Sequence, residues 1–514
     1  MAIYSFNPFG YEGSLVTVEC DIRTGEFPAV DIIGLADNAV GESRERMRAA
    51  IKSSGFEFPS ERVLMSLSPA DMRKEGGGFD LAMCLAVLAA KDDYPRSQDA
   101  NVLVMGEVEL CGSLRSCRAI YPALCEAAKA GIKYAIIPEG SETAIPNGIR
   151  AERCESLRGA YEALARIDEG NVYGGEPCPE PRREETKVTV CFDGTDKDGS
   201  ALDSLKEMNG LKFAMAVAAA GGHHLMAWGK PGCGKTVALT HFPELLPYLT
   251  DVESESSTRI HSVAGLLRPN EGLMKVRPFR MPHQTVSIEG MCGGGAHCRP
   301  GEVSLAHNGV LFLDDAAEFR ASVLQMLRVP LETGAITLSR AGRTTTYPAN
   351  FQLVMAANPC PCGNYGNPDK VCLCSRESVQ WYWKKFSAPL IDRIAIRFDC
   401  NAEHERSELN ADWSLSGLRT MIERARRRQH ERQGKLNQDL EPIYVLEHFK
   451  PNPTAKKALV KWVSENASSQ RAVANVLRLA QTIADMDGSE DIELTEIEIA
   501  MELHGKPPVD IDSD

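Results

Sequence analysis

Short apolar runs alternate with amphipathic stretches along the first third of the chain. Four runs have the length and the β-branched content of strands: SLVTVEC (14–20), RVLMSLSP (62–69), NVLVMGEVEL (101–110) and YAIIPE (134–139). Three stretches between them follow a helical period: residues 38–55, 79–91 and 119–131. This alternation predicts a self-sufficient α/β domain over residues 1–167.

A second α/β pattern follows a polar segment. Residues 168–207 are rich in Gly, Pro and charge apart from the short run VTVCF, so we expect a linker. Residues 208–400 again alternate strands with helices. Residues 401–505 follow a helical period, as in LRTMIERARRRQHERQ and RAVANVLRLAQTIADM, and residues 506–514 form an acidic tail.

Composition and charge limit the classes of protein that fit. The 514 residues are 43% hydrophobic and 25% charged, with a formal net charge of -14. This charge argues against a protein that coats nucleic acid over its whole surface, but it leaves room for a basic lining inside a channel. No run approaches the ~20 apolar residues of a membrane helix, and the first residues lack a signal-peptide pattern. We expect a cytoplasmic protein with no membrane partner.

A phosphate-binding loop is predicted after the short apolar strand LMAW and before a helical run. It consists of Gly229, Lys230, Pro231, Gly232, Cys233, Gly234, Lys235 and Thr236. These residues fulfil the pattern G-x-x-x-x-G-K-[ST] in its usual context, where backbone N–H groups close around phosphate. We expect Lys235 to reach the β- and γ-phosphates of ATP and the Thr236 hydroxyl to bind Mg²⁺. A chance glycine turn is the alternative.

Two later apolar runs end in polar residues that suit the same site. GVLFLDDAAEF is typical of a central parallel strand and ends at Asp314 and Asp315. Asp314 is the expected Mg²⁺-side carboxylate, and Asp315 would orient the attacking water. FQLVMAANPCPCG ends its apolar run at Asn358, whose amide can hydrogen-bond the γ-phosphate or the water. A turn residue before Pro359 is the alternative for Asn358.

Together these motifs resemble one family. GKPGCGKT, RPFRMPHQTVS, CRPGEVSLAHNGVLFLDD, LRVPLETGAITLSR, FQLVMAANPCPCG and APLIDRIAIRFD are similar to the magnesium-chelatase-like AAA+ ATPases, specifically the competence protein ComM (YifB) group. The resemblance covers nearly the whole chain apart from the linker and tail. It implies an α/β multidomain ATPase with a P-loop AAA+ core and a C-terminal helical lid. It also implies a homo-oligomeric ring, a hexamer, that acts on DNA as a branch-migration translocase.

The resemblance also implies roles for individual residues. At matching positions, phosphate and Mg²⁺ are bound by Lys235 and Thr236, the acidic pair is Asp314 and Asp315, and the first sensor is Asn358. Arg393 in LIDRI is similar to the arginine finger that a neighbouring subunit supplies, and Arg471 in SSQRAVANV to the second sensor of the lid. For Arg393 the alternative is a surface salt bridge with Asp392. At Arg471, SQR departs from the more usual SAR.

Asp315 departs from the family pattern, which mostly has glutamate there. The shorter carboxylate is displaced by roughly 1 Å, and a misplacement of that size can cost about 10²-fold in rate. We therefore expect a working but slower ATPase. An assembly scaffold that binds ATP with weak hydrolysis is one alternative, and the ATPase subunit of a magnesium chelatase is another.

The N-terminal pattern resembles the Lon protease domain, whose serine and lysine form a catalytic dyad. Alignment of RKEGGGFDLAM puts Gly78 where the nucleophile would stand, and alignment of RAIYPALCEAAKAG puts Tyr121 where the lysine would be. Without a hydroxyl and an amine there is no dyad. We expect a structural or partner-binding domain.

Most of the sixteen cysteines, such as Cys84, are scattered and suit small buried positions. Four cluster with the spacing C-x-C-x9-C-x-C: Cys360, Cys362, Cys372 and Cys374. Four thiolates in two close pairs can close a tetrahedral structural Zn²⁺ site, and the alternative is a loop with chance cysteines.

Two basic segments are candidates for nucleic-acid contact. AITLSRAGRTTTYPANFQLV predicts a hairpin around Ala341 and Gly342 with Arg340 and Arg343 near its tip. In the family such a hairpin faces the pore of the ring, where arginines would track a phosphate backbone. A solvated turn is the alternative. The segment ERARRRQHERQGK is expected to be a solvated helix face with internal ion pairs.

Overall fold

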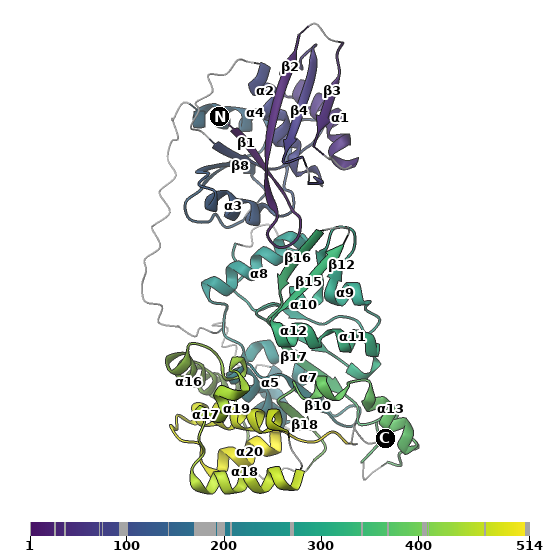
Figure 1. Ribbon diagram of the computed structural model, residues 1–514, viewed down its shortest axis with the longest axis vertical. Coiled ribbons are helices and arrows are strands. Elements are labelled where there is room, and N and C mark those ends of the chain that lie inside the picture. The colour runs from purple at the N-terminus through teal and green to yellow at the C-terminus, as the bar shows by residue number, and fades with distance from the viewer. Residues whose placement is uncertain are drawn as a thin grey trace.

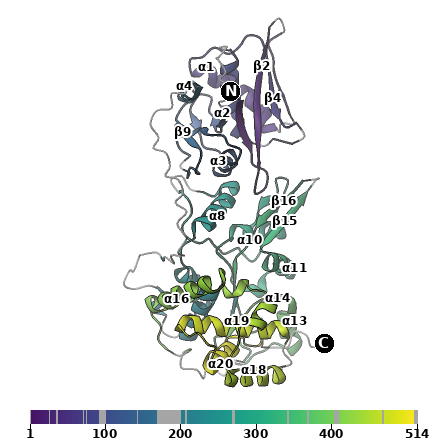
Figure 2. The ribbon, with the colours of Figure 1, turned by 60° about the vertical axis from the view of Figure 1, so that its left-hand side comes forward.

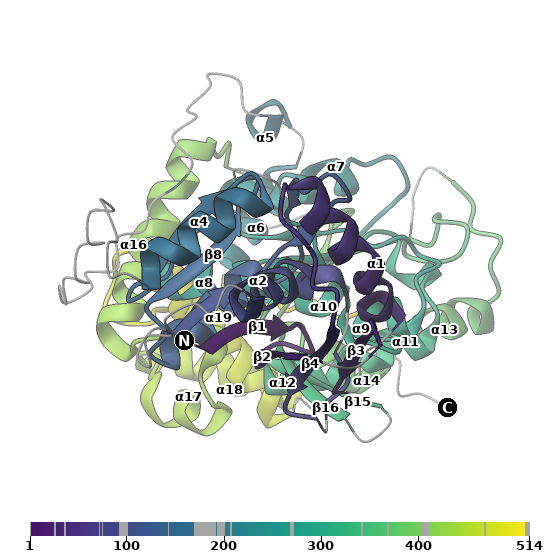
Figure 3. The ribbon, with the colours of Figure 1, turned by 90° about the horizontal axis from the view of Figure 1, so that it is seen from above.

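The computed structural model describes residues 2–168, 192 and 201–508, apart from short gaps at 25–26, 35–37, 71, 75, 92–100, 142, 206–207, 268–271, 341–342, 367–369, 403–408, 410 and 467–468. Three units follow one another along the longest axis (Figure 1). We call them the N-terminal unit (2–168), the central unit (201–402) and the helical unit (409–508). Seen along that axis, the N-terminal unit overlies the other two (Figure 3). The predicted VTVCF run, except for Phe192, and the end of the acidic tail lie outside the described residues.

The N-terminal unit is built on a seven-stranded mixed sheet with the order β3-β4-β2-β1-β5-β8-β9. Its strands are β1 (Ala2–Asn7), β2 (Ser14–Arg23), β3 (Val30–Ile33), β4 (Arg62–Ser68), β5 (Asn101–Val104), β8 (Tyr134–Pro138) and β9 (Arg150–Cys154). Its helical segments are α1 (Asn38–Ser53), η1 (Gly77–Phe79), α2 (Asp80–Lys91), α3 (Ile120–Lys129) and α4 (Leu157–Asp168). A short ribbon, β6 (Glu107–Val108) with β7 (Leu114–Arg115), lies beside the sheet. Two apolar cores cover the two faces of the sheet, one under α1, α2 and α4 and one under α3.

The central unit contains a five-stranded sheet with the order β11-β14-β17-β10-β18. All neighbours in it are parallel, and its strands are β10 (Leu225–Trp228), β11 (Phe279–Arg280), β14 (Val310–Leu313), β17 (Gln352–Ala357) and β18 (Ile396–Asp399). Two antiparallel pairs stand outside the sheet: β12 (Gly293–Gly294) with β13 (Arg299–Pro300), and β15 (Ala335–Arg340) with β16 (Arg343–Pro348).

Helices cover both faces of this sheet. They are α5 (Ala201–Ser204), α6 (Asn209–Gly221), α7 (Lys235–Thr240), α8 (Asp251–Ala264), α9 (Ile288–Cys292), α10 (Glu302–Leu305), α11 (Ala321–Met326), α12 (Arg328–Thr333), α13 (Arg376–Lys384) and α14 (Ala388–Ile391). Three 3-10 turns accompany the helices: η2 (Phe242–Leu245) and η3 (Ala316–Glu318) here, and η4 (Asn437–Asp439) in the helical unit. On one face α6 shares a continuous apolar core with the helical unit. On the other face α11 and α13 enclose a separate core that includes Trp383 and Tyr347.

The helical unit contains helices where the sequence predicted them, so this prediction is confirmed. It contains α16 (Leu415–Gln433), α17 (Pro442–His448), α18 (Pro453–Asn466), α19 (Gln470–Asp487) and α20 (Leu494–Leu503). α19 packs against α16, α20 and α6, and it lies at the centre of the unit (Figure 1). No helix among the described residues is both long and apolar enough to cross a membrane.

Two sequence expectations differ from the structure. α5 falls within the segment 168–207 that was expected to be a linker, yet Leu202 is buried in the core of the central unit and Asp203 caps the backbone N–H of Leu415 at 2.7 Å. A four-residue helix carries too little periodicity to stand out in a polar segment.

The basic segment of α16 was expected to be a solvated face with internal ion pairs. Arg424, Arg427 and Arg432 are exposed and Arg427 pairs with Glu423 one turn earlier, but the expectation was wrong for Arg426. Arg426 is buried and donates to the Ala219 carbonyl at 2.7 and 2.9 Å, and burial lowers its pKa to about 9. Arg432 pairs with the buried carboxylate of Asp485 at 2.6 Å. These side chains therefore attach α16 to α6 of the central unit and to α19 of its own unit. Charge alone does not reveal this, because an arginine can bury its stem while its guanidinium pairs with a carbonyl or carboxylate.

The loop between β1 and β2 joins the N-terminal unit to the central unit. The Arg259 guanidinium, on α8, donates to the backbone oxygens of Tyr11 and Glu12 at 2.8 Å and to the Glu126 carboxylate at 2.7 Å. The Tyr11 backbone N–H donates to Thr345 Oγ1 at 3.1 Å. The loop is thus held between α8 and the β15–β16 hairpin, and Figure 2 shows the hairpin directed toward it.

Candidate functional site

Parallel strand register brings the predicted site residues to one edge of the central sheet. β10 pairs with β17 so that Trp228 lies opposite Ala357, and β14 pairs with β17 so that Leu313 lies opposite Met355. The residues after these strands are therefore neighbours at the carboxyl edge, where open α/β sheets bind ligands. The phosphate loop, the acidic pair and Asn358 all begin there.

The phosphate loop surrounds its own lysine. Gly232 and Gly234 have φ angles of 79° and 97°, a left-handed conformation that a glycine adopts without strain. Lys235 begins α7 and is only 7% exposed. Its ammonium group donates to the carbonyls of Gly229 at 2.7 Å and Lys230 at 3.0 Å. The loop thus places the positive charge of the Lys235 side chain at its centre, as a loop that binds an anion requires.

The two residues expected to bind Mg²⁺ contact each other. The Thr236 hydroxyl donates to Asp314 Oδ1 at 2.8 Å, although the two residues lie on different strand-to-helix connections. A hydroxyl oxygen and a carboxylate oxygen are hard ligands of the kind that Mg²⁺ prefers. The donor set and its position beside the loop therefore fit a magnesium ion bound with phosphate.

Asp315 is held in a strained conformation beside Asn358. Its φ and ψ of 46° and 52° lie in the left-handed region, which costs a non-glycine residue roughly 1–2 kcal/mol. Asn358 Nδ2 donates to Asp315 Oδ1 at 3.3 Å, and Lys235 Nζ donates to Asn358 Oδ1 at 3.5 Å. Burial, and then the neighbouring Asp314 carboxylate, raise the pKa of Asp315. A carboxylate with a raised pKa is a stronger base, which suits a group that polarises water.

Asn358 is fixed by two aromatic residues of α13 that the sequence did not indicate. Its backbone N–H donates to the Tyr382 hydroxyl at 3.3 Å, and Trp383 Nε1 donates to the Pro359 carbonyl at 3.0 Å. Trp383 is completely buried. These bonds make Asn358 part of a rigid edge, in contrast to a free turn residue. The helical spacing of the buried residues Val379, Tyr382 and Trp383 in RESVQWYWK is the signal that marks α13, but it does not identify the contact with Asn358.

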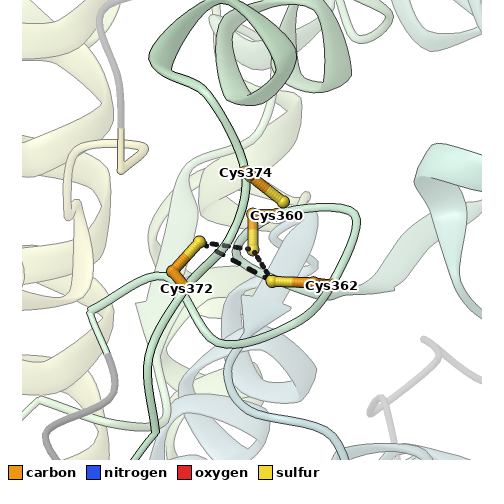
Figure 4. Close-up of side chains that lie close together, drawn as sticks. All are labelled: Cys360, Cys362, Cys372 and Cys374. Atoms are coloured by element: carbon orange, nitrogen blue, oxygen red, sulfur yellow. Dashed lines mark hydrogen bonds between the residues drawn. The ribbon is translucent and has the colours of Figure 1, made fainter.

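The four clustered cysteines meet at one point (Figure 4). Their sulfur atoms all lie within 4.8 Å of one another. Cys360 is 3.4 Å from Cys362 and 3.7 Å from Cys372, and Cys362 is 3.6 Å from Cys372. Zn²⁺ bound at ~2.3 Å by four thiolates in a tetrahedron requires sulfur-to-sulfur distances of about 3.8 Å. The spacing therefore fits a four-thiolate zinc site with no open position.

The cysteine loop also contacts the phosphate loop. Gly363 has a φ of 78°, and a Cβ atom built on it would lie 2.4 Å from Pro231 Cγ. Such a distance excludes any side chain at Gly363 unless one of the two loops moves. The cysteine cluster is therefore in contact with the predicted nucleotide site on two sides, through Asn358 and through Pro231.

Arg393 and Arg471 line a different part of the surface. Both face a cavity of about 820 Å³, and none of its lining residues belongs to the phosphate loop. Arg393 pairs with Glu332 at 2.7 Å and donates to the Pro389 carbonyl at 2.6 Å. The salt bridge considered with Asp392 is therefore replaced by one with Glu332. Both arginines lie away from the phosphate loop of their own chain.

Another arginine of this cavity, Arg478, was not predicted as a site residue. Arg478 is buried on α19 and donates to Asn475 Oδ1 at 2.9 Å and to the Leu440 carbonyl. Burial lowers its pKa to about 10. Arg478 could not be recognised from the sequence, because it lies among the apolar residues of the helix α19.

The predicted hairpin forms with the expected register, since Arg340 pairs with Arg343 across β15 and β16. The turn itself, Ala341 and Gly342, lies outside the described residues. The Arg340 guanidinium is 3.9 Å from the Glu289 carboxylate, and the Arg343 guanidinium stacks 4.9 Å from the centre of the Phe9 ring. Arg343 thus contacts the N-terminal unit.

In the N-terminal unit, Gly78 and Tyr121, the positions aligned with the serine and the lysine of a protease dyad, both lie in helical segments. Gly78 lies in η1, and Tyr121 is buried on α3, where burial raises the pKa of its hydroxyl.

Comparison with known sequences covers nearly the whole chain. Residues 201–408 match the family described as magnesium chelatase, subunit ChlI, residues 18–141 match subunit ChlI of Mg-chelatase, and residues 412–504 match the magnesium chelatase subunit ChlI C-terminal family. The chain is 33% identical to competence protein ComM of Haemophilus influenzae, over 95% of this chain and 94% of the relative. It is 34% identical to YifB of Escherichia coli, over 94% and 92%. A partial match, 27% identical over 31% of this chain and 36% of the relative, is to the DNA repair protein RadA of Mycolicibacterium smegmatis.

The contact between Gly363 and Pro231 generates a first prediction. Gly363→Ala should weaken binding of a fluorescent ATP analogue by ~10-fold, because overpacking of 1–3 kcal/mol falls on the phosphate loop. Gly366→Ala is the matched control, since Gly366 has a similar φ of 73° in the same loop but nothing within 4 Å of a built Cβ. Equal affinities of the two variants, measured by fluorescence titration, would contradict a coupling between the loops.

Proposed function

Because the chain belongs to the magnesium-chelatase-like AAA+ family that includes ComM and YifB, and is therefore a P-loop ATPase, we propose that it is a ring-forming motor that acts on DNA. The observation that carries the proposal is the separation of Arg393 and Arg471 from the phosphate loop. An arginine that stabilises the transferring phosphoryl group must then come from a neighbouring subunit. Such head-to-tail contacts generate rings when they close.

Each residue at the sheet edge has its own role in the proposed hydrolysis. In this proposal Lys235 leaves the carbonyls of its own loop and pairs with phosphate oxygens. Thr236 and Asp314 would hold Mg²⁺, which neutralises phosphate charge when bound. Asp315 orients the attacking water and accepts its proton, and Asn358 holds the Asp315 carboxylate in place.

The cavity beside α12 and α19 is the surface that would receive the neighbouring subunit's nucleotide. Arg393 acts there as the arginine finger and Arg471 as the second sensor. Glu332 pairs with Arg393 in the single chain and lies near Arg471 as well. We propose that phosphate oxygens replace Glu332 when the subunits assemble into a hexamer. ATP hydrolysis would then depend on assembly.

DNA is the proposed substrate of the motor. Support comes from the names of two relatives, a competence protein and a DNA repair protein, and from the β15–β16 hairpin with its arginines. Arg340 and Arg343 would contact the phosphate backbone from the pore. Because Arg343 also stacks on Phe9, the N-terminal unit would sense the position of the hairpin. A motor of this kind acts in the cytoplasm, where the DNA is.

A role as the ATPase subunit of a magnesium chelatase is the second candidate. The family names of all three matched segments refer to that subunit, so these names do not separate the two functions. The full-length match to ComM favours the DNA motor. A scaffold with weak hydrolysis ranks third, because a chain that had lost hydrolysis would be expected to lose some of its other catalytic residues as well. The residues that remain in place are Lys235, Thr236, Asp314, Asn358 and Arg393.

We also propose that the N-terminal unit has the Lon protease fold without protease activity. Neither Gly78 nor Tyr121 offers the hydroxyl or the amine of a Ser–Lys dyad. In this view the unit serves as a structural clamp on the hairpin through Tyr11 and Arg259.

The cysteine cluster is proposed to bind one structural Zn²⁺. Cys360 is buried beside Trp383, and a metal there would fix the segment that follows Asn358. The Cys362 thiol already has a pKa lowered to about 6, first by a backbone hydrogen bond from Asn364. Metal binding requires the thiolate form, so the bound ion would also have to lower the pKa values of Cys372 and Cys374, which are raised without it.

ATP hydrolysis with and without branched DNA tests the motor. The natural protein should hydrolyse ATP faster with branched DNA, and Lys235→Ala should abolish turnover. Asp315→Glu should raise turnover, by up to about 10²-fold, because the longer carboxylate reaches the water. Glu318→Gln, at an exposed acid of the same turn, is the control and should leave the rate unchanged.

DNA-independent turnover in every variant would contradict the motor. Turnover that appears only in Asp315→Glu would instead favour the scaffold. Mg²⁺ insertion into a porphyrin with partner subunits, at a rate that needs ATP, would favour the chelatase.

Metal analysis tests the zinc proposal. The purified chain should contain about one zinc per chain, since a four-thiolate site binds one ion. Cys372→Ser should lose the metal, and Cys111→Ser, at an exposed cysteine of the N-terminal unit, should keep it. A folded natural protein without metal would end the proposal.

A further inference from the structure

A second pair of cysteines lies inside the nucleotide site. Cys233 belongs to the phosphate loop, and Cys400 directly follows β18 at the same edge of the sheet. Each thiol is the first influence on the pKa of the other, since Cys400 lowers the pKa of Cys233 and Cys233 raises that of Cys400, and both residues are partly exposed. Neither thiol belongs to the zinc cluster or has a role in hydrolysis.

Close approach of the backbone brings this pair together. A Cβ atom built on Gly229 would lie 3.0 Å from Cys400 Cβ and 3.4 Å from Cys233 Sγ, so the glycine fits between the two cysteines. The Cys400 N–H donates to the Trp228 carbonyl at 2.8 Å. The next residue, Asn401, accepts a hydrogen bond from the Lys230 N–H at 3.0 Å. Cys400 is therefore anchored against the phosphate loop on both of its sides.

The chemistry around Cys233 favours oxidation. Lys235 Nζ lies 3.7 Å from Cys233 Sγ, and a thiolate is stabilised by such a cation. The neighbouring Cys400 thiol and then Lys235 lower the pKa of Cys233 to about 6, against burial, which raises it. A partly exposed thiolate beside a second thiol is the arrangement of a redox-sensitive cysteine with its resolving partner.

We propose that Cys233 and Cys400 form a reversible disulfide that closes the phosphate loop to nucleotide. The inference rests on the proposed ATP binding at this loop. Phosphate can enter only if Lys235 leaves the Gly229 and Lys230 carbonyls and the loop opens around it. A covalent bond from Cys233 to the anchored Cys400 would hold the loop in its closed form.

A hydroperoxide is the oxidant in this proposal. The Cys233 thiolate attacks the terminal oxygen of the hydroperoxide, the O–O bond breaks, and the alcohol or water leaves with a proton. Cys233 is then a sulfenic acid. The Cys400 sulfur attacks the Cys233 sulfur, the S–S bond forms, and the hydroxyl leaves as water with the Cys400 proton. Two thiols are oxidised and one hydroperoxide is reduced, and a dithiol reductant reverses the reaction.

The experiment compares the reduced and the hydrogen peroxide-treated full-length protein. Binding of a fluorescent ATP analogue is titrated in both states, and peptides are analysed by mass spectrometry without reduction. We expect a peptide linked through Cys233 and Cys400, an affinity lower by at least ~10-fold, and full recovery with a dithiol. Absence of the linked peptide would overturn the proposal.

Three variants locate the effect, each compared with its own reduced form. Cys233→Ala should keep its affinity after peroxide. In Cys400→Ala the oxidised Cys233 lacks a partner and proceeds to sulfinic acid, so a dithiol should fail to restore binding. Cys111→Ala, at an exposed cysteine elsewhere, should respond like the natural protein. Equal loss in Cys233→Ala, or full recovery in Cys400→Ala, would contradict the proposal.

The same titration separates this proposal from the proposed function. If the reduced natural protein fails to bind the ATP analogue, the ATPase proposal fails. If it binds the analogue equally in the reduced and oxidised states, only the redox proposal fails.

Discussion

The parallel pairing of β14, β17 and β10 is the constraint on which the rest of the site depends. It aligns three strand ends, so that a hydroxyl and a carboxylate far apart in sequence meet in the 2.8 Å bond from Thr236 to Asp314. Lys235, Asn358 and Asp315 are linked at the same edge. These three strands are buried on both faces, so their register is fixed by the close packing of their side chains against the helices on either side. The core of the sheet thus determines the chemistry at its edge.

Much of this could be predicted from the sequence because local pattern and motif spacing agree. The strands at residues 14–20, 62–69 and 134–139 and the helices between the predicted runs are confirmed as β2, β4, β8 and α1 to α3, whereas the run 101–110 is divided into β5 and the separate short strand β6. β1, β3 and β9 were not predicted; β9 is an edge strand with the polar sequence RAERC, which lacks a strand pattern. The phosphate loop, the acidic strand end and Asn358 were located by their strand context. The roles of these residues in catalysis stay predictions.

Contacts between distant segments could not be predicted. No local pattern shows that Arg426 is buried against α6, or that Arg259 fastens the β1–β2 loop to α8. The contact of Gly363 with Pro231 and the pairing of Cys233 with Cys400 likewise depend on how loops fold over the sheet edge. The position of Arg393 and Arg471 in a cavity without phosphate-loop residues is the most consequential of these features, because in the proposed motor one chain would then be an incomplete enzyme.

A mixing experiment tests this incompleteness most directly. Lys235→Ala lacks a working phosphate loop and Arg393→Ala lacks the arginine finger, so each variant alone should hydrolyse no ATP. In an equimolar mixture, a random ring places an intact loop beside an intact arginine at about a quarter of its head-to-tail interfaces. We expect turnover to return to about that fraction of the natural rate per chain. Mixed rings that assemble but stay inactive would contradict the sharing of the site between subunits.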